Sequence, residues 1–249
     1  MRTIVRILAV VFAVLFPPLS WGAITVDNVD SLEGTTTSAN KNVTVGGSVN
    51  LAMVFVCQRD TDASGFTAGT ASVTVGGAAA TSLTAIQNAD GLTRMAPFYR
   101  LAPATGTVNV AVTPDTGADR WVAGVAVFTG VAQTSTFNTE GTNSSNATTN
   151  ADIDALASAV GELGVLGGCV RTATSTPSPD ATAPTSTEIL DVAHTNATSV
   201  RVFIYTEDGA SSTIDMRVDL SASERWSGWA ASLRPTASAF RRRGAVMYP

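Results

Sequence analysis

The chain has 249 residues, of which 45% are hydrophobic and 14% are charged, with a net charge of −5 and a single His. Disordered chains combine low hydrophobicity with high net charge, so this composition excludes disorder and predicts a folded chain with a large core. One His also excludes multi-His metal sites and the HExxH zinc helix.

The first residues differ in composition from the rest of the chain. Two Arg residues precede the apolar run Ile7–Phe16, and the small residues Ser20 and Gly22 lead to Ala23. This order is typical of a secretory signal peptide, and ten apolar residues are too few to span a bilayer. We expect residues 1–22 to be cleaved before Ala23 and the protein to be secreted, at a cell surface or on a virion.

The remaining chain is acidic. Removal of residues 1–22, which hold two basic residues and no acidic one, leaves 13 basic and 20 acidic residues, a net charge of −7. Nonspecific nucleic-acid binding depends on neutralising phosphates, so an acidic body disfavours it. We expect residues 236–249, with the triplet Arg241–Arg243, to be a flexible and dispensable tail.

Strand patterns dominate residues 23–235. Alternating runs with β-branched residues are Ile24–Val29, Val43–Val45, Ser72–Val75 and Thr107–Val112. Leu51–Cys57 and Trp121–Phe128 are more continuously apolar, as strands buried on both faces are. Short strands separated by Gly and Asp-Gly turns predict an all-β fold, an antiparallel β-sandwich.

Residues 152–163 allow two interpretations. Apolar residues at helical spacing, beginning with Ile153 and ending with Leu163, would suit a short helix. Gly161 interrupts that pattern, and an apolar run follows it. We favour strand–turn–strand over a helix.

A weak internal duplication runs through the sandwich region. Several short segments recur 105 to 112 residues later: Phe98-Tyr99 as Ile204-Tyr205, Thr107–Val112 as Thr213–Val218, Arg120-Trp121 as Arg225-Trp226, and Cys57–Arg59 as Cys169–Arg171. The pseudo-repeats would span about 23–131 and 132–235. Such a repeat fits either two tandem domains or two halves of one sandwich. No linker composition separates the halves, which favours one body.

Four segments resemble a known bacterial and phage domain. They are Tyr99–Thr107 (YRLAPATGT), Trp121–Thr134 (WVAGVAVFTGVAQT), Val73–Gly77 (VTVGG) and Trp229–Pro235 (WAASLRP). In this order they resemble a jelly-roll-like β-sandwich domain of surface or virion-associated proteins. Ala132 stands where that domain usually has Asp. The resemblance implies a sandwich over about residues 23–235 and implies no catalytic residues.

Two cysteines each end an apolar, strand-like run. An exported protein with an even number of cysteines is expected to form disulfides, and Cys57 with Cys169 allows one pairing. The duplication would place both at equivalent positions. The alternative is two buried free thiols.

A calcium site is a weaker candidate. Asp60, Asp62 and Ser64 place oxygen atoms at alternating positions before Gly65, as in the first half of a calcium loop. The twelfth position is Ala71 rather than a bidentate Glu. A solvated loop with Asx turns is the favoured alternative, and we expect no other cofactor.

Aromatic residues supply a second binding candidate. Trp121, Trp226 and Trp229 could form a stacking platform for sugars. Each has apolar neighbours in the sequence, so a core position is the favoured alternative. We expect His194 to lie at the surface or in a turn, because no Gly-x-Ser-x-Gly nucleophile motif accompanies it.

These observations favour a non-enzymatic structural or adhesion module that is displayed on a virion or a cell surface. Its partners would be proteins of that assembly, or glycans. The alternative is a secreted carbohydrate-binding module, assisted by calcium at Asp60 and Asp62. A secreted hydrolase would need converging acids or His194 beside a Ser, and no spacing in the sequence indicates either.

Overall fold

A computed structural model describes residues 23–47, 49–61, 65–67, 69–172, 174–180, 186–196, 200–210 and 212–237. The expected signal peptide, the candidate ligands Asp62 and Ser64, and residues 238–249 of the expected tail lie outside these residues.

The described residues form strands and no helix, which confirms the all-β prediction. The first half contains β1 (Thr25–Gly34), β2 (Ala39–Val45), β3 (Val49–Arg59), β4 (Ser72–Val75), β5 (Ala78–Ala79), β6 (Thr81–Ser82), β7 (Ile86–Gln87), β8 (Thr93–Leu101), β9 (Gly106–Thr113) and β10 (Arg120–Thr129). The second half contains β11 (Phe137–Ala157), β12 (Leu163–Val170), β13 (Pro177–Pro179), β14 (Thr187–Ala193), β15 (Arg201–Asp208) and β16 (Thr213–Leu233).

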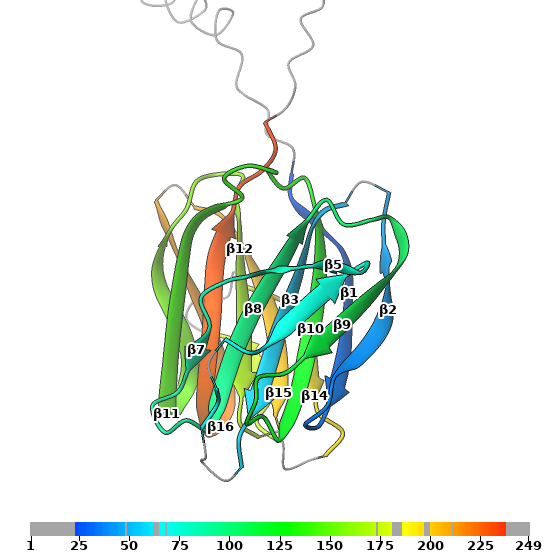
Figure 1. Cartoon of the computed structure of the whole chain (residues 1–249). Coiled ribbons are helices and arrows are strands. Elements are labelled where there is room, and N and C mark those ends of the chain that lie inside the picture. Colours follow the sequence, from blue (N-terminus) through cyan, green and yellow to red (C-terminus); the bar gives the residue numbers. More distant parts are fainter. Residues whose placement is uncertain are drawn as a thin grey trace, which may run out of the picture.

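The strands form three antiparallel sheets that pack face to face (Figure 1). A front sheet has the order β2-β9-β4-β5. The first large sheet has the order β1-β10-β3-β8-β6, with β7 also paired to β8. The second large sheet has the order β11-β16-β12-β15-β14, with β13 paired to β16. The antiparallel sandwich predicted from the sequence is therefore present.

Three clusters of buried apolar side chains lie between the layers. The first, which includes Val54 and Trp121, lies between the front sheet and the first large sheet. The second, which we call the shared core, lies between the two large sheets and includes Phe55 and Trp229. The third includes Trp226 and covers the outer face of the second large sheet.

The two halves have the same pairing order. In the first half β1, β10, β3 and β8 are neighbours, and in the second half β11, β16, β12 and β15 are neighbours in that order. In the front sheet β9 pairs with β2 on one side and with β4 on the other. In the second half the early part of β16 pairs in the same way with the later part of β11 and with β13. Each half is thus a sandwich of its own, and the two pack through their large sheets.

The segment with two interpretations is not helical. Residues up to Ala157 belong to β11, and β12 begins at Leu163 after a turn at Gly161. Ile153 and Leu156 are buried in the third cluster, and a bulge between them replaces strict alternation. The bulge explains the helix-like spacing, since it shifts the buried face by one residue.

Ala155 lies in this bulge with a φ of 55° and is exposed. Residues other than Gly pay roughly 1 kcal/mol or more in this left-handed region. We therefore expect Ala155→Gly to raise the free energy of unfolding by about 0.5 kcal/mol, because part of that gain is lost to the entropy of Gly. Ala157→Gly, at an exposed site of the same strand, is the control and should lose about 0.5–1 kcal/mol. Urea denaturation measures both, and equal losses would contradict the explanation.

A disulfide joins the two halves. Cys57 of β3 and Cys169 of β12 are bonded, their Cα atoms are 5.0 Å apart, and both residues are completely buried. This confirms the predicted pairing. The bond crosses the shared core and links the corresponding strands of the two sandwiches.

An ion pair also crosses between the halves. Asp90, after β7, pairs with Arg225 of β16, and Asn88 donates to Asn146 of β11 at 3.1 Å. Burial raises the pKa of Asp90, but hydrogen bonds from Arg225, the Leu92 backbone and Asn88 outweigh burial and lower it below the usual value of an Asp. An acid whose pKa is lowered by folding stabilises the protein above its unfolded pKa and loses this contribution as pH falls.

We therefore expect Asp90→Asn to lower the free energy of unfolding by up to about 1 kcal/mol at neutral pH. The difference from the native protein should shrink as pH falls below about 4, because the carboxylate is protonated first in the unfolded chain and, owing to its lowered pKa, only at lower pH in the folded protein. Urea denaturation at about pH 7 and about pH 3 measures the change. Asp208→Asn, at an exposed carboxylate, is the control. A deficit of the same size at both pH values would show that the ion pair is not its cause.

Candidate functional site

The calcium-loop candidate is closed by its own hydrogen bonds. Asp60 is buried, and its carboxylate accepts from the Gly65 backbone at 2.6 Å. The Thr61 backbone donates to Asp119 at 2.7 Å. Each carboxylate therefore accepts from a backbone N–H of this loop, Asp60 from within the loop and Asp119 from the loop after β9. Among the described residues no three His, Cys, Asp or Glu side chains are placed to hold a metal ion. Calcium binding stays a prediction, because Asp62 and Ser64 lie outside those residues.

The tryptophan platform was a wrong prediction. Trp121, Trp226 and Trp229 have exposed fractions of 0%, 1% and 0%, so no ring offers a face to a sugar. Each ring fills a different apolar cluster. Trp229 packs near Phe55 and Phe137 with ring centroids 5.9 and 5.8 Å apart. The strand segments that carry these rings are buried on both faces, so each ring lies inside the molecule, as the favoured alternative from the sequence had it.

His194 follows β14 at a turn but is buried, not at the surface. Its Nδ1 accepts from the Asn196 backbone at 3.0 Å, so the ring proton lies on Nε2, which donates to the Gly34 carbonyl at 3.2 Å. Nε2 therefore joins the end of β14 to the end of β1, and Nδ1 holds the local turn after His194. This His has a structural role that links the two large sheets.

The first and last described segments meet at one end of the molecule (Figure 1). Val131 pairs with Pro235, and Thr236 donates to the Gly130 carbonyl at 2.7 Å. Two pockets open at this end, with volumes of about 530 and 310 Å³. Val160 lines both pockets, and 74% of it is exposed. We call this region the terminal end.

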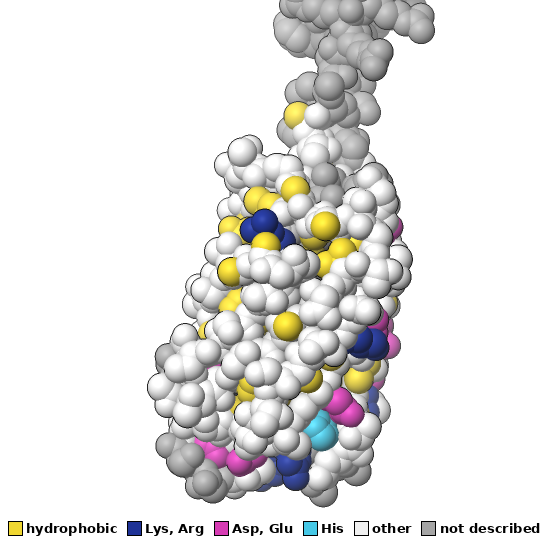
Figure 2. All heavy atoms as spheres, turned by 45° about the vertical axis from the view of Figure 1, so that its right-hand side comes forward, with side chains coloured by type: hydrophobic (Ala, Val, Ile, Leu, Met, Phe, Trp, Pro, Cys, Tyr) yellow, Lys and Arg dark blue, Asp and Glu magenta, His cyan; other side chains and the backbone are white. Residues whose placement is uncertain are grey.

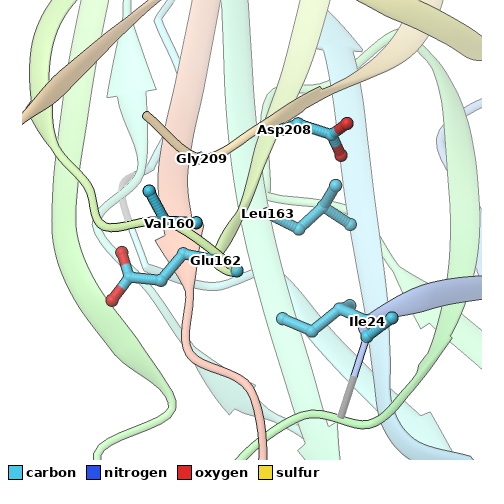
Figure 3. A pocket seen from close by; sticks show the side chains of 8 residues that line it. Ile24, Val160, Glu162, Leu163, Asp208 and Gly209 are labelled. Carbon is cyan, nitrogen blue, oxygen red and sulfur yellow. The ribbon is translucent and has the colours of Figure 1, made fainter. Parts of the chain in front are cut away.

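Glu162 also lines both pockets. Its Oε2 accepts from the Ser232 hydroxyl at 2.7 Å, the Asn138 amide at 3.1 Å and the Ala159 backbone at 3.1 Å. Figure 3 shows its carboxylate pointing away from that of Asp208 on the far side of the smaller pocket. The two acids do not converge on one point, as a general acid and base acting on one substrate must.

A second polar cluster lies between β8 and the loop after β9. Asp115 is almost completely buried, and the Gln58 amide, the Thr70 backbone and the Ala71 backbone donate to its carboxylate at 2.8–2.9 Å. Nε of Arg94 lies 2.9 Å from the same carboxylate. Arg94 and Asp115 both line a pocket of about 360 Å³.

Sequence reasoning missed this cluster. Arg94, Ala96 and Phe98 alternate along β8, so the pattern does place an Arg on the inward face. The inward position of Arg94 was the one sequence signal for this cluster. The acid partner lies in a different loop, and no spacing along the chain indicates it.

Charged side chains are few and occur in small groups on the face shown in Figure 2, and most of that face is uncharged. No helix among the described residues is long and apolar enough to cross a membrane. Comparison of the chain with protein-family models, curated proteins and solved structures finds no match. The resemblance to the bacterial and phage sandwich domain therefore stays a prediction.

Proposed function

We propose that this protein is a non-enzymatic structural or adhesion module that is exported and displayed on a cell surface or a virion. The observation that carries the proposal is the buried disulfide between Cys57 and Cys169. Disulfides of this kind form and persist in oxidising, extracellular environments. The signal-peptide pattern of residues 1–22 independently favours the same compartment.

The arrangement of the described chain ends supports a role in display. Residues 23–24 and 235–237 lie at the terminal end, beside pockets with the exposed side chain of Val160. Attachment through this end would leave the sides and the opposite end of the sandwich free for contact. Proteins of the same assembly are the partners that we propose, and the buried tryptophans remove the specific support for glycan binding.

The test is immunogold labelling of intact and permeabilised cells and of any virions from the source, with an antibody raised against residues 23–235. We expect labelling without permeabilisation. Intact-mass analysis of the labelled fraction should show a chain that starts at Ala23 and is lighter by the two hydrogen atoms of one disulfide. Labelling only after permeabilisation, with both thiols alkylated once the protein is denatured without reductant, would contradict the proposal.

A further inference from the structure

The pocket beside Arg94 lies at an open edge of the first sandwich, between the front sheet and the first large sheet. Its walls include Leu83, Ala85, Ala96 and Phe98. Leu83 and Ala85 belong to the stretch between β6 and β7, where Leu83 still donates to the Pro97 carbonyl of β8 at 2.9 Å and ladder pairing then stops until Ile86. The pocket exists because this edge strand is broken into two pieces.

The guanidinium of Arg94 has N–H donors for which the described residues supply no acceptor. Only 7% of Arg94 is exposed, and its one partner among these residues is Asp115, opposite Nε. A guanidinium has five N–H donors, and burial of donors without acceptors is costly. Asp115 already accepts from Gln58, Thr70 and Ala71. Arg94 thus lines the pocket as a buried cation with donors to spare.

In the second half, the arginine at the equivalent position is Arg201, which pairs with Asp191 of β14. Arg94 pairs with Gln58, next to Cys57, and Arg201 pairs with Val170, next to Cys169, so the two arginines occupy equivalent positions. Beside Arg201, however, the edge strand β14 runs for seven residues and supplies Asp191 as a partner. The pocket beside Arg94 therefore lies where the edge strand of the first half differs from that of the second half.

We propose that this pocket binds a small monocarboxylate with a short apolar body, such as a free carboxylic acid or the C-terminal residue of a peptide. The carboxylate would take the unused donors of Arg94, which suit a planar, bidentate anion. The apolar body would lie against Ala85, Ala96 and Phe98. A volume of about 360 Å³ lies at the small end of the range for ligand sites and fits a body of a few carbon atoms.

The test is a titration of the ¹⁵N-labelled mature chain followed by NMR. The probes are pentanoate, its neutral analogue pentanamide, and a short peptide ending in Val with a free or an amidated C-terminus. We expect pentanoate, the free peptide or both to shift the amide signals of β8 and of residues 82–85. The probe that binds identifies the source of the carboxylate. Equal binding of pentanamide, or no binding of either carboxylate, would overturn the proposal.

Three variants locate the site. Arg94→Gln should weaken carboxylate binding about 10-fold or more, because it removes a charge-assisted hydrogen bond. Arg201→Gln changes the equivalent residue of the second half and should leave binding unchanged. Ala85→Phe should abolish binding by filling the pocket while Arg94 and Asp115 stay in place, which keeps the test valid if Arg94→Gln does not fold. Full binding by folded Ala85→Phe would overturn the proposal. The site does not depend on display at a surface, so neither result bears on the immunogold test.

Discussion

Replacing both Cys57 and Cys169 with Ala is expected to lower the free energy of unfolding by about 4–5 kcal/mol. The disulfide closes a loop between residues 112 positions apart, and in the chain-entropy description a loop of this length gives a stabilisation of that size. For a chain of this length each kcal/mol shifts the melting temperature by roughly 2–4 °C. The double variant should therefore melt roughly 8–20 °C below the native protein.

The native protein under strong reducing conditions should show a comparable loss, and the double variant supplies the control because reductant should leave its melting temperature unchanged. Differential scanning calorimetry measures all three samples. If reduction left the native melting temperature unchanged while two thiols became titratable, the bond would contribute nothing to stability. That result would contradict its role in holding the halves together.

The second large effect is expected at Gly167 in β12, which faces the shared core. A Cβ atom placed on Gly167 would overlap the ring of Phe55, which is completely buried in the opposite sheet. The ring has little room to move, because it also packs against Trp229. Overpacking of a tight core costs roughly 1–3 kcal/mol and occasionally more. We expect Gly167→Ala to lose at least the upper part of this range.

Gly47→Ala is the matched control, because no atom lies within 4 Å of the position that its Cβ would take. It should change the free energy of unfolding by less than about 0.5 kcal/mol. Chemical denaturation of both variants gives the comparison. Similar, small losses in the two would mean that the large sheets are not packed as closely at Phe55 and Gly167 as described.

The fold class followed from local patterns in the sequence. Alternation in Thr107–Val112 and the apolar run Trp121–Phe128 correspond to β9 and β10, because a strand with one buried face must alternate and a central strand need not. The pairing of Cys57 with Cys169 was also predictable, since two cysteines in an exported chain leave one choice. These features depend on residues close in sequence or on simple counting.

Other features depend on packing between distant strands. β11 and β16 each run for 21 residues and serve two layers, although the first half uses separate strands for the same purpose. No sequence pattern within β11 indicates that this strand continues from one layer into the next. The pocket beside Arg94 arises from a missing stretch of edge strand, and the alternation of Thr93–Leu101 gives no sign of it.

The central claim is that the two sandwiches form one body through the shared core. Incorporation of 5-fluorotryptophan into the mature chain places one ¹⁹F probe in each apolar cluster: Trp121 in the first, Trp229 in the shared core and Trp226 in the third. Urea titration followed by ¹⁹F NMR then reports on all three clusters in one sample. We predict the same midpoint for the three signals. Distinct midpoints for Trp121 and Trp226 would show two independently stable domains and contradict the claim.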